Sequence, residues 1–204
     1  MSTALATEAH YTPEDLLALP DEERYELVGG RLVERNMGAE SSWVEGRVYS
    51  RLDQFCEDHH LGIVWPASNG YQCFPHNPDL VRRPDVSFVR HGRLPGDVVP
   101  KGWVKIPPDL AVEVVSPKDR VYDLDEKLAD YRKVHIPLVW VINPESRTVT
   151  VYRIDGSIRL LFEDDELSGE DIIPGFRCPI REILPPREPT EPAQPTSAGP
   201  DVPK

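Results

Sequence analysis

The sequence has few cysteines and no long apolar run, and each of these absences argues against a class of protein. Its three cysteines, Cys56, Cys73 and Cys178, lie in no paired spacing, which argues against a disulfide framework or a thiolate zinc site. No stretch approaches the roughly 18 apolar residues that span a bilayer. Residues 1–11 lack the basic and apolar regions of a secretory signal. We therefore expect a cytoplasmic protein with no membrane segment and with reduced, buried cysteines.

Basic residues are scarce relative to acids. The formal net charge is −12, and residues 163–171 contain many acids and no base, which is typical of a solvated acidic loop. Non-specific binding to nucleic acid depends on cations that neutralise phosphates, so an acidic chain needs a local basic patch to contact DNA. The candidate patch consists of Arg82, Arg83, Lys118 and Arg120.

The apolar content is sufficient for one core. With 39% hydrophobic residues among 204, we expect a single domain at residues 11–184, after a flexible N-terminus at 1–10. Residues 185–204 are rich in proline with Thr, Ser and Gly, a composition typical of a disordered tail.

Local patterns predict a mixture of helices and strands. Residues 12–15, Thr-Pro-Glu-Asp, are typical of a helix start with Thr12 as N-cap. Residues 24–35 contain two β-prone runs joined by Gly29-Gly30, which predicts a hairpin. Apolar residues at helical spacing indicate amphipathic helices at 41–59 and 122–135.

The remaining segments predict a sheet. Strands are expected at 61–65, 70–74, 84–90, 109–115, 137–142, 147–154 and 158–162, and residues 172–180 should pack a last edge. The fold class is therefore α/β, in the sense of a mixed α+β sheet with flanking helices.

Two of these apolar strands each carry one carboxylate where the pattern calls for a hydrophobic residue. Asp85 begins the run 84–90, and Glu113 lies in 109–115, a strand apolar enough to be covered on both faces. A buried charge is costly unless it is paired or binds a metal. Carboxylate oxygens are ligands for Mg²⁺ and Mn²⁺, so the two acids predict a divalent-metal site.

Further candidates surround this pair. Lys127 lies on the flank of the apolar stripe of its helix, where it can reach over the sheet and assist hydrolysis at a phosphate. The backbone carbonyl of Val114 follows Glu113 and can complete the coordination. Glu26 is a candidate extra acid, as a ligand through water or a partner for Lys127, and Asp123 can pair with Lys127 one helical turn away.

Each residue alone also has a structural interpretation. A carboxylate on a core strand is more often satisfied by internal hydrogen bonds than bound to a metal. Lys127 alone is typical of a solvated helix lysine, and Glu26 of a hairpin surface acid. The site interpretation depends on the ordered combination of Asp85, Glu113 and Lys127.

That combination resembles a known family. The segments that carry the likeness are 25–32 (YELVGGRL), 83–86 (RPDV), 110–117 (LAVEVVSP), 123–131 (DLDEKLADY) and 137–144 (PLVWVINP). They resemble the bacterial Uma-type restriction endonucleases of the PD-(D/E)XK nuclease superfamily over roughly residues 11–184. The resemblance implies a restriction-endonuclease-like core with an N-terminal β-hairpin, and a divalent metal bound through Asp85 and Glu113.

The chain departs from the superfamily pattern at two places. The pattern has a lysine two residues after the second acid, where this chain has Val115. In the Uma-type family that lysine is understood to lie on the following helix, which fits Lys127. Members often carry a histidine early in the long helix, whereas this chain has Ser42-Trp43-Val44 there.

Three hypotheses for function follow. The first is a Mg²⁺- or Mn²⁺-dependent endonuclease that hydrolyses DNA, with Asp85 and Glu113 as ligands, Lys127 activating water or stabilising the transition state, and Glu26 assisting. A homodimer would suit cleavage of both strands. The second, favoured by the acidic body, is a catalytically inactive binding or assembly protein with the same fold. The third is a hydrolase of another phosphodiester, including RNA.

Overall fold

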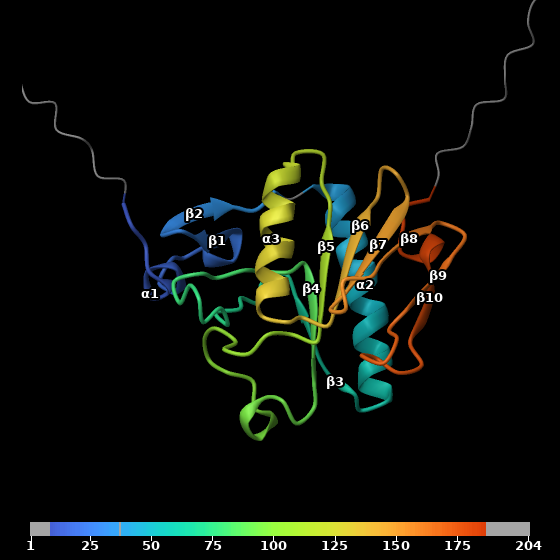
Figure 1. Cartoon of the computed structure of the whole chain (residues 1–204), viewed down its shortest axis with the longest axis horizontal. Coiled ribbons are helices and arrows are strands. Elements are labelled where there is room, and N and C mark those ends of the chain that lie inside the picture. The colour runs from blue at the N-terminus through green and yellow to red at the C-terminus, as the bar shows by residue number, and fades with distance from the viewer. Residues whose placement is uncertain (1–8, 37, 187–204) are drawn as a thin grey trace, which may run out of the picture.

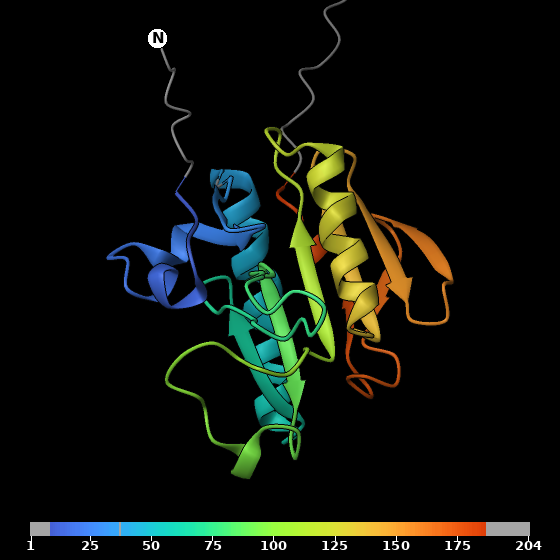
Figure 2. The same cartoon turned by 60° about the vertical axis from the view of Figure 1, so that its left-hand side comes forward.

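The computed structural model describes residues 9–36 and 38–186, so the expected N-terminal segment and proline-rich tail lie almost entirely outside the described residues. Figure 1 shows a central sheet between helices, and the turned view of Figure 2 shows one long helix on each face of that sheet. The helices are α1 (Pro13–Leu17), α2 (Ala39–Asp58) and α3 (Val121–Lys133). Both predicted amphipathic helices are therefore confirmed.

The main sheet is mixed and has the order β3-β4-β5-β6-β7-β8. Its strands are β3 (Gly62–Pro66), β4 (Val86–Arg90), β5 (Leu110–Val114), β6 (Leu138–Asn143), β7 (Thr148–Arg153) and β8 (Ile158–Phe162). β5 and β6 are parallel, and the other neighbours are antiparallel. Because parallel neighbours need a crossover, α3 connects β5 to β6 across one face. The predicted mixed α/β fold is confirmed.

The central strand β5 is covered on both faces, as its apolar sequence predicts. Leu110, Val112 and Val114 pack in the core beneath α2, and Ala111 packs in a second core beneath α3. Strand alternation therefore directs Glu113 to the α3 face.

The N-terminal hairpin consists of β1 (Tyr25–Val28) and β2 (Arg31–Glu34). Gly29 and Gly30 have φ values of 57° and 75°, as a two-residue turn with both residues left-handed requires. The fully buried side chain of Arg83 fastens this hairpin to the sheet, because it donates to the Tyr25 carbonyl at 2.9 Å and pairs with Glu22. The hairpin thereby lies beside the end of β5.

The predicted strand at 70–74 is wrong. Within it only Tyr71 pairs, through isolated bridges to Arg82 and Val104. The apolar residues that suggested a strand, Tyr71, Cys73 and Phe74, are buried in the core on the α3 face. The pattern reflects the burial of a loop and not the pairing of a strand.

The acidic segment 163–171 is also more ordered than predicted. It contains β9 (Glu166–Ser168), which pairs with β10 (Arg177–Pro179) in a separate two-stranded sheet. Its acids pair with arginines from other segments: Glu163 with Arg147, Asp164 with Arg181, Glu166 with Arg177 and Glu170 with Arg153. The prediction of a solvated loop is therefore wrong at 166–168. Residues 172–180 do pack on the core, through Ile173, Phe176, Cys178 and Ile180.

The three cysteines are free and buried, as predicted. In the described part of the chain, no helix combines the length and the apolar character that a membrane span requires.

Candidate active site

A pocket opens where β5 ends, α3 begins and the hairpin meets them. It encloses about 690 Å³ of space, part of it open to solvent. All the residues predicted for the site line it: Glu26, Asp85, Glu113, Val114 and Lys127. The fold therefore brings together residues that are up to about a hundred positions apart in the sequence.

Glu113 lies at the floor of this pocket and is 5% exposed. Its Oε1 accepts a hydrogen bond of 2.5 Å from the Tyr131 hydroxyl, and its Oε2 lies 2.9 Å from Lys127 Nζ. Lys127 and Tyr131 are four residues apart on α3, so both side chains lie on the helix face that covers β5. The helix thus holds both oxygens of the carboxylate.

Lys127 also contacts Glu26, whose Oε1 lies 3.1 Å from its Nζ. Glu26 is 2% exposed, so the alternative of a hairpin surface acid is wrong. Its carboxylate accepts further bonds from Arg82 at 3.1 Å and from the Arg83 backbone N–H at 2.9 Å. The expected pair between Asp123 and Lys127 does not form, because the ammonium is directed at the two buried acids.

Asp85 immediately precedes β4 and faces the same pocket. Its Oδ2 accepts a hydrogen bond of 2.7 Å from the Val114 N–H. Its Oδ1 accepts one of 2.7 Å from Arg35, which follows β2 and also donates to the Ala67 carbonyl at 3.0 Å. Asp85 therefore connects β4, β5 and the hairpin.

Arg82 and Arg83 do not form the predicted basic patch. Both are buried, and Arg82 joins Glu26 to Asp130 of α3 through bonds of 3.0 and 2.7 Å to Asp130 Oδ2. The two adjacent arginines suggest a surface patch in the sequence, but in the fold the Arg82 guanidinium neutralises the buried acids Glu26 and Asp130. The Arg83 guanidinium binds the Tyr25 carbonyl and the partly buried Glu22.

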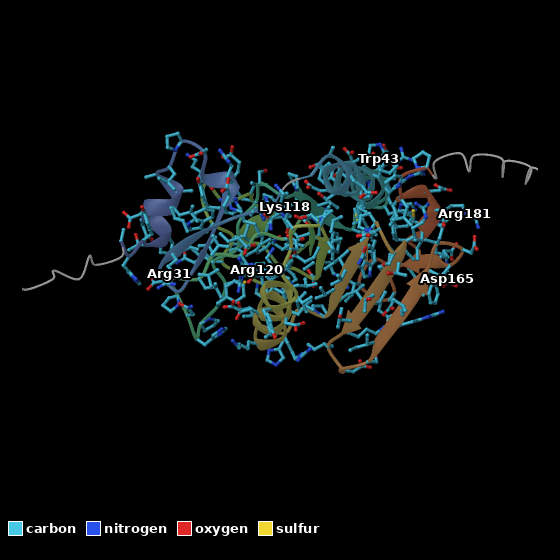
Figure 3. All side chains as sticks on the ribbon, turned by 90° about the horizontal axis from the view of Figure 1, so that it is seen from above. Arg31, Trp43, Lys118, Arg120, Asp165 and Arg181 are labelled. Carbon is cyan, nitrogen blue, oxygen red and sulfur yellow. The ribbon has the colours of Figure 1, made fainter. Side chains whose placement is uncertain are left out.

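The other two cations of that patch, Lys118 and Arg120, are exposed in the loop that leads into α3. Asn36 donates to the Lys118 carbonyl and to Asp119, which ties this loop to the mouth of the pocket. Figure 3 looks onto this end of the molecule and shows Lys118 and Arg120 between Arg31 of the hairpin and Trp43 of α2.

The pKa values of the acids in the site depend on how many cations lie beside each acid. Burial raises the pKa of Glu113 to about 7, and Asp85 and Glu26 act in the same direction against Lys127. Burial also raises the pKa of Glu26, but Lys127 and Arg82 outweigh it, so that pKa lies below its usual value. Burial lowers the pKa of Lys127, but Glu113, Glu26 and Asp85 together outweigh burial, so this pKa lies above its usual value. Glu113 is less neutralised than Glu26, because the two acids share Lys127 and Glu26 also pairs with Arg82.

A fourth acid, Glu45 of α2, lies within electrostatic reach of Asp85. Burial raises its pKa to about 7, Asp85 acts in the same direction, and Arg35 opposes. The sequence interpretation missed Glu45, Arg35 and Tyr131. Tyr131 alone had a local signal, since it lies four residues after Lys127 on the predicted helix face.

The residues present fit a hydrated divalent ion. Asp85, Glu113 and the Val114 carbonyl could offer oxygen ligands to such an ion. Each oxygen of the two carboxylates accepts one hydrogen bond and can make a further contact. Within residues 9–36 and 38–186, no group of three or more His, Cys, Asp or Glu is arranged to hold a metal ion. Two carboxylates and one carbonyl are oxygen donors of the kind that bind Mg²⁺, an ion that usually keeps several of its waters.

Comparisons with known proteins agree with this fold. The family named Uma2, described as "Putative restriction endonuclease", matches residues 13–181. A solved structure from Anabaena variabilis, described as a putative nuclease, has a TM-score of 0.70 and 19% identity, and covers 85% of this chain and 97% of its own. At this identity the likeness shows a shared fold. None of the curated proteins matches the chain. Because the family match spans most of its length, the chain belongs to the Uma2 family.

Proposed function

We propose that the protein is a divalent-metal-dependent endonuclease that hydrolyses phosphodiester bonds of DNA. The observation that carries this proposal is Glu113, a nearly buried acid on the central strand that lines an open pocket together with Asp85 and Lys127. A purely structural acid has no need of a solvent-connected pocket. Membership of the Uma2 family supports nuclease chemistry in general.

Each residue has a distinct role in this proposal. Asp85, Glu113 and the Val114 carbonyl hold Mg²⁺ or Mn²⁺, which when bound supplies a Lewis acid and a more acidic water. The Lys127 ammonium, 2.9 Å from Glu113, orients the attacking water and stabilises negative charge on the phosphate oxygens. Glu26 positions that ammonium from the other side at 3.1 Å. Water adds to phosphorus as the bond to one ester oxygen breaks, which leaves a phosphomonoester and a hydroxyl.

The surface at the mouth of the pocket suits a polyanionic substrate. Lys118 and Arg120 are exposed beside the pocket, next to its lining residue Asp119, and within residues 9–36 and 38–186 neither side chain has a recorded carboxylate partner. Several other surface arginines are paired with acids, for example Arg177 with Glu166. These two exposed cations beside the pocket can contact the phosphates of a nucleic-acid backbone.

Cleavage of supercoiled plasmid DNA tests the proposal. We expect nicked and linear products with Mg²⁺ or Mn²⁺, none with chelator, and a loss of at least about 100-fold in rate for Asp85→Asn, Glu113→Gln and Lys127→Met. Glu166→Gln is a matched control, since this exposed acid belongs to the separate β9–β10 sheet. Wild-type rates in Asp85→Asn and Glu113→Gln would refute the assignment. Labelled RNA under the same conditions distinguishes the two substrates.

A second candidate is a non-catalytic binding or assembly protein. One observation favours it: Asp85 is paired with Arg35 and Glu113 with Lys127, so the acids are neutralised without a metal. Titration with Mn²⁺ by calorimetry separates the candidates. No saturable binding at millimolar metal supports the second, and light scattering shows whether the protein forms the homodimer that would place two sites on a duplex.

A further inference from the structure

Arg35 is a cation at the site that the proposed chemistry does not use. Its side chain is 9% exposed, and its guanidinium lies 2.7 Å from Asp85 Oδ1 and 3.0 Å from the Ala67 carbonyl. A buried guanidinium needs such partners, because an unpaired buried charge is costly. Arg35 therefore occupies one of the two oxygens with which Asp85 would bind a metal.

Four acids act electrostatically on Arg35, and one of them, Asp85, contacts it. Burial lowers its pKa, but Asp85, Glu26, Glu113 and Glu45 together outweigh burial and raise it. An arginine also stays protonated under all ordinary conditions, so it cannot lose its charge to make room for another cation. The guanidinium thus carries a permanent positive charge among the acids that would attract a divalent ion.

We propose that Arg35 is a resident counter-cation that competes with the divalent ion for the Asp85 carboxylate. The inference rests on the proposed function for the identity of the ligand. Metal binding then requires the guanidinium to share or release Asp85 Oδ1, and two cations at one carboxylate repel each other. Arg35 lowers metal affinity and neutralises the pocket when no metal is present.

The structure also offers a place for the displaced group. Glu45 interacts electrostatically with both Arg35 and Asp85 from the α2 side. A guanidinium that leaves Asp85 can therefore remain near an acid, and its bond to the Ala67 carbonyl does not involve Asp85. Displacement within the site is chemically reasonable because the guanidinium can keep its bond to the Ala67 carbonyl.

Calorimetric titration of the full chain with Mn²⁺, at one pH and one ionic strength, tests the proposal. We expect Arg35→Gln to bind Mn²⁺ at least about tenfold more tightly than wild type. Arg35→Lys, which keeps the charge, should remain close to wild type. Arg24→Gln is the matched control, because Arg24 belongs to the same hairpin region and pairs with Glu34 on the exposed side.

Two further variants show where the effect arises. The gain should disappear in Arg35→Gln/Asp85→Asn, since the competition is for that carboxylate. Arg35→Met keeps an apolar stem in the pocket and should show the same gain as Arg35→Gln. Melting temperatures provide a second measurement: without metal the neutral variants should melt below wild type, and Mn²⁺ should raise their melting temperature more.

The possible failures are distinguishable. If wild type binds Mn²⁺ and Arg35→Gln and Arg35→Met bind it equally or more weakly, the competition is refuted, and Arg35 instead orients Asp85 for the metal. If neither wild type nor the Arg35 variants bind Mn²⁺ at millimolar concentration, the metal-dependent function and this inference both fail. Binding by the variants but not by wild type would support the inference most strongly.

Discussion

Lys127 Nζ of α3 lies 2.9 Å from Glu113 Oε2 of β5. The nuclease pattern has a lysine on the strand where this chain has Val115, and we propose that Lys127 supplies that cation from the helix. Because the same ammonium also contacts Glu26, one side chain joins the central strand, the hairpin and the helix. Lys127 therefore contributes both to the geometry of the site and to the packing of these three elements.

Replacement of Lys127 should destabilise the protein strongly. Lys127→Met leaves Glu113 buried without a cation and weakens the neutralisation of Glu26, and removal of one partner from a buried pair costs about 3–5 kcal/mol. Urea denaturation measures the change in the free energy of unfolding. Lys127→Met/Glu113→Gln should recover a large part of the loss, and a Lys127→Met variant as stable as wild type would contradict the account.

The Tyr131 hydroxyl should contribute measurably to the same cluster. It donates at 2.5 Å to Glu113 Oε1 in the buried interior, and hydrogen bonds to charged groups contribute about 1.5–3 kcal/mol. Tyr131→Phe should lower the free energy of unfolding by that amount. Tyr122→Phe, on the exposed first turn of α3, should change nothing. Equal stability of the two variants would show that the bond is unimportant.

Glu45 should make stability fall as pH rises. Its pKa is raised by burial from 4.5 to about 7, so the folded state binds a proton that the unfolded state releases. The stability contributed by this proton is complete below pH 4.5 and is lost as pH rises through 7. The advantage of Glu45→Gln over wild type should therefore increase between pH 5 and pH 7.5, as measured by urea denaturation. A difference that is constant with pH would contradict this prediction.

The loop before α3 should contact the substrate backbone. Lys118→Glu/Arg120→Glu should weaken DNA binding, measured with Ca²⁺ in place of Mg²⁺, and should lower the salt dependence by about one for each lost phosphate contact. Lys101→Glu/Arg159→Glu makes the same change of charge at two exposed positions outside the loop before α3, one in the loop between β4 and β5 and one on β8. Equal effects of the two pairs would show that only net charge matters.

The core of the site could be predicted because strand alternation and helical spacing determine the directions in which its side chains point. Strand alternation places Glu113 on the face opposite Val112 and Val114, and helical spacing places Lys127 beside the apolar stripe. The pocket that contains Asp85, Glu113 and Lys127 shows that those directions converge.

The rest of the site depends on tertiary packing, which no local pattern encodes. Arg35 and Glu45 come from the hairpin and α2, and they approach Asp85 only because both elements pack beside the sheet. Arg82 was misread as a surface cation since its partners Glu26 and Asp130 lie 56 and 48 residues away in the sequence. The segment 70–74 resembled a strand because its apolar residues are buried, although the segment forms a loop.

The central claim is that Asp85 and Glu113 act together as the ligands of one divalent ion. A crystal structure of the protein with Mn²⁺, in which anomalous scattering locates the metal, tests this claim most directly. The account predicts a manganese peak in the pocket, bound by oxygens of Asp85 and Glu113 and by the Val114 carbonyl, with the Lys127 ammonium beside it. Well-ordered Asp85 and Glu113 carboxylates with no manganese between them, at a concentration that supports cleavage, would contradict it.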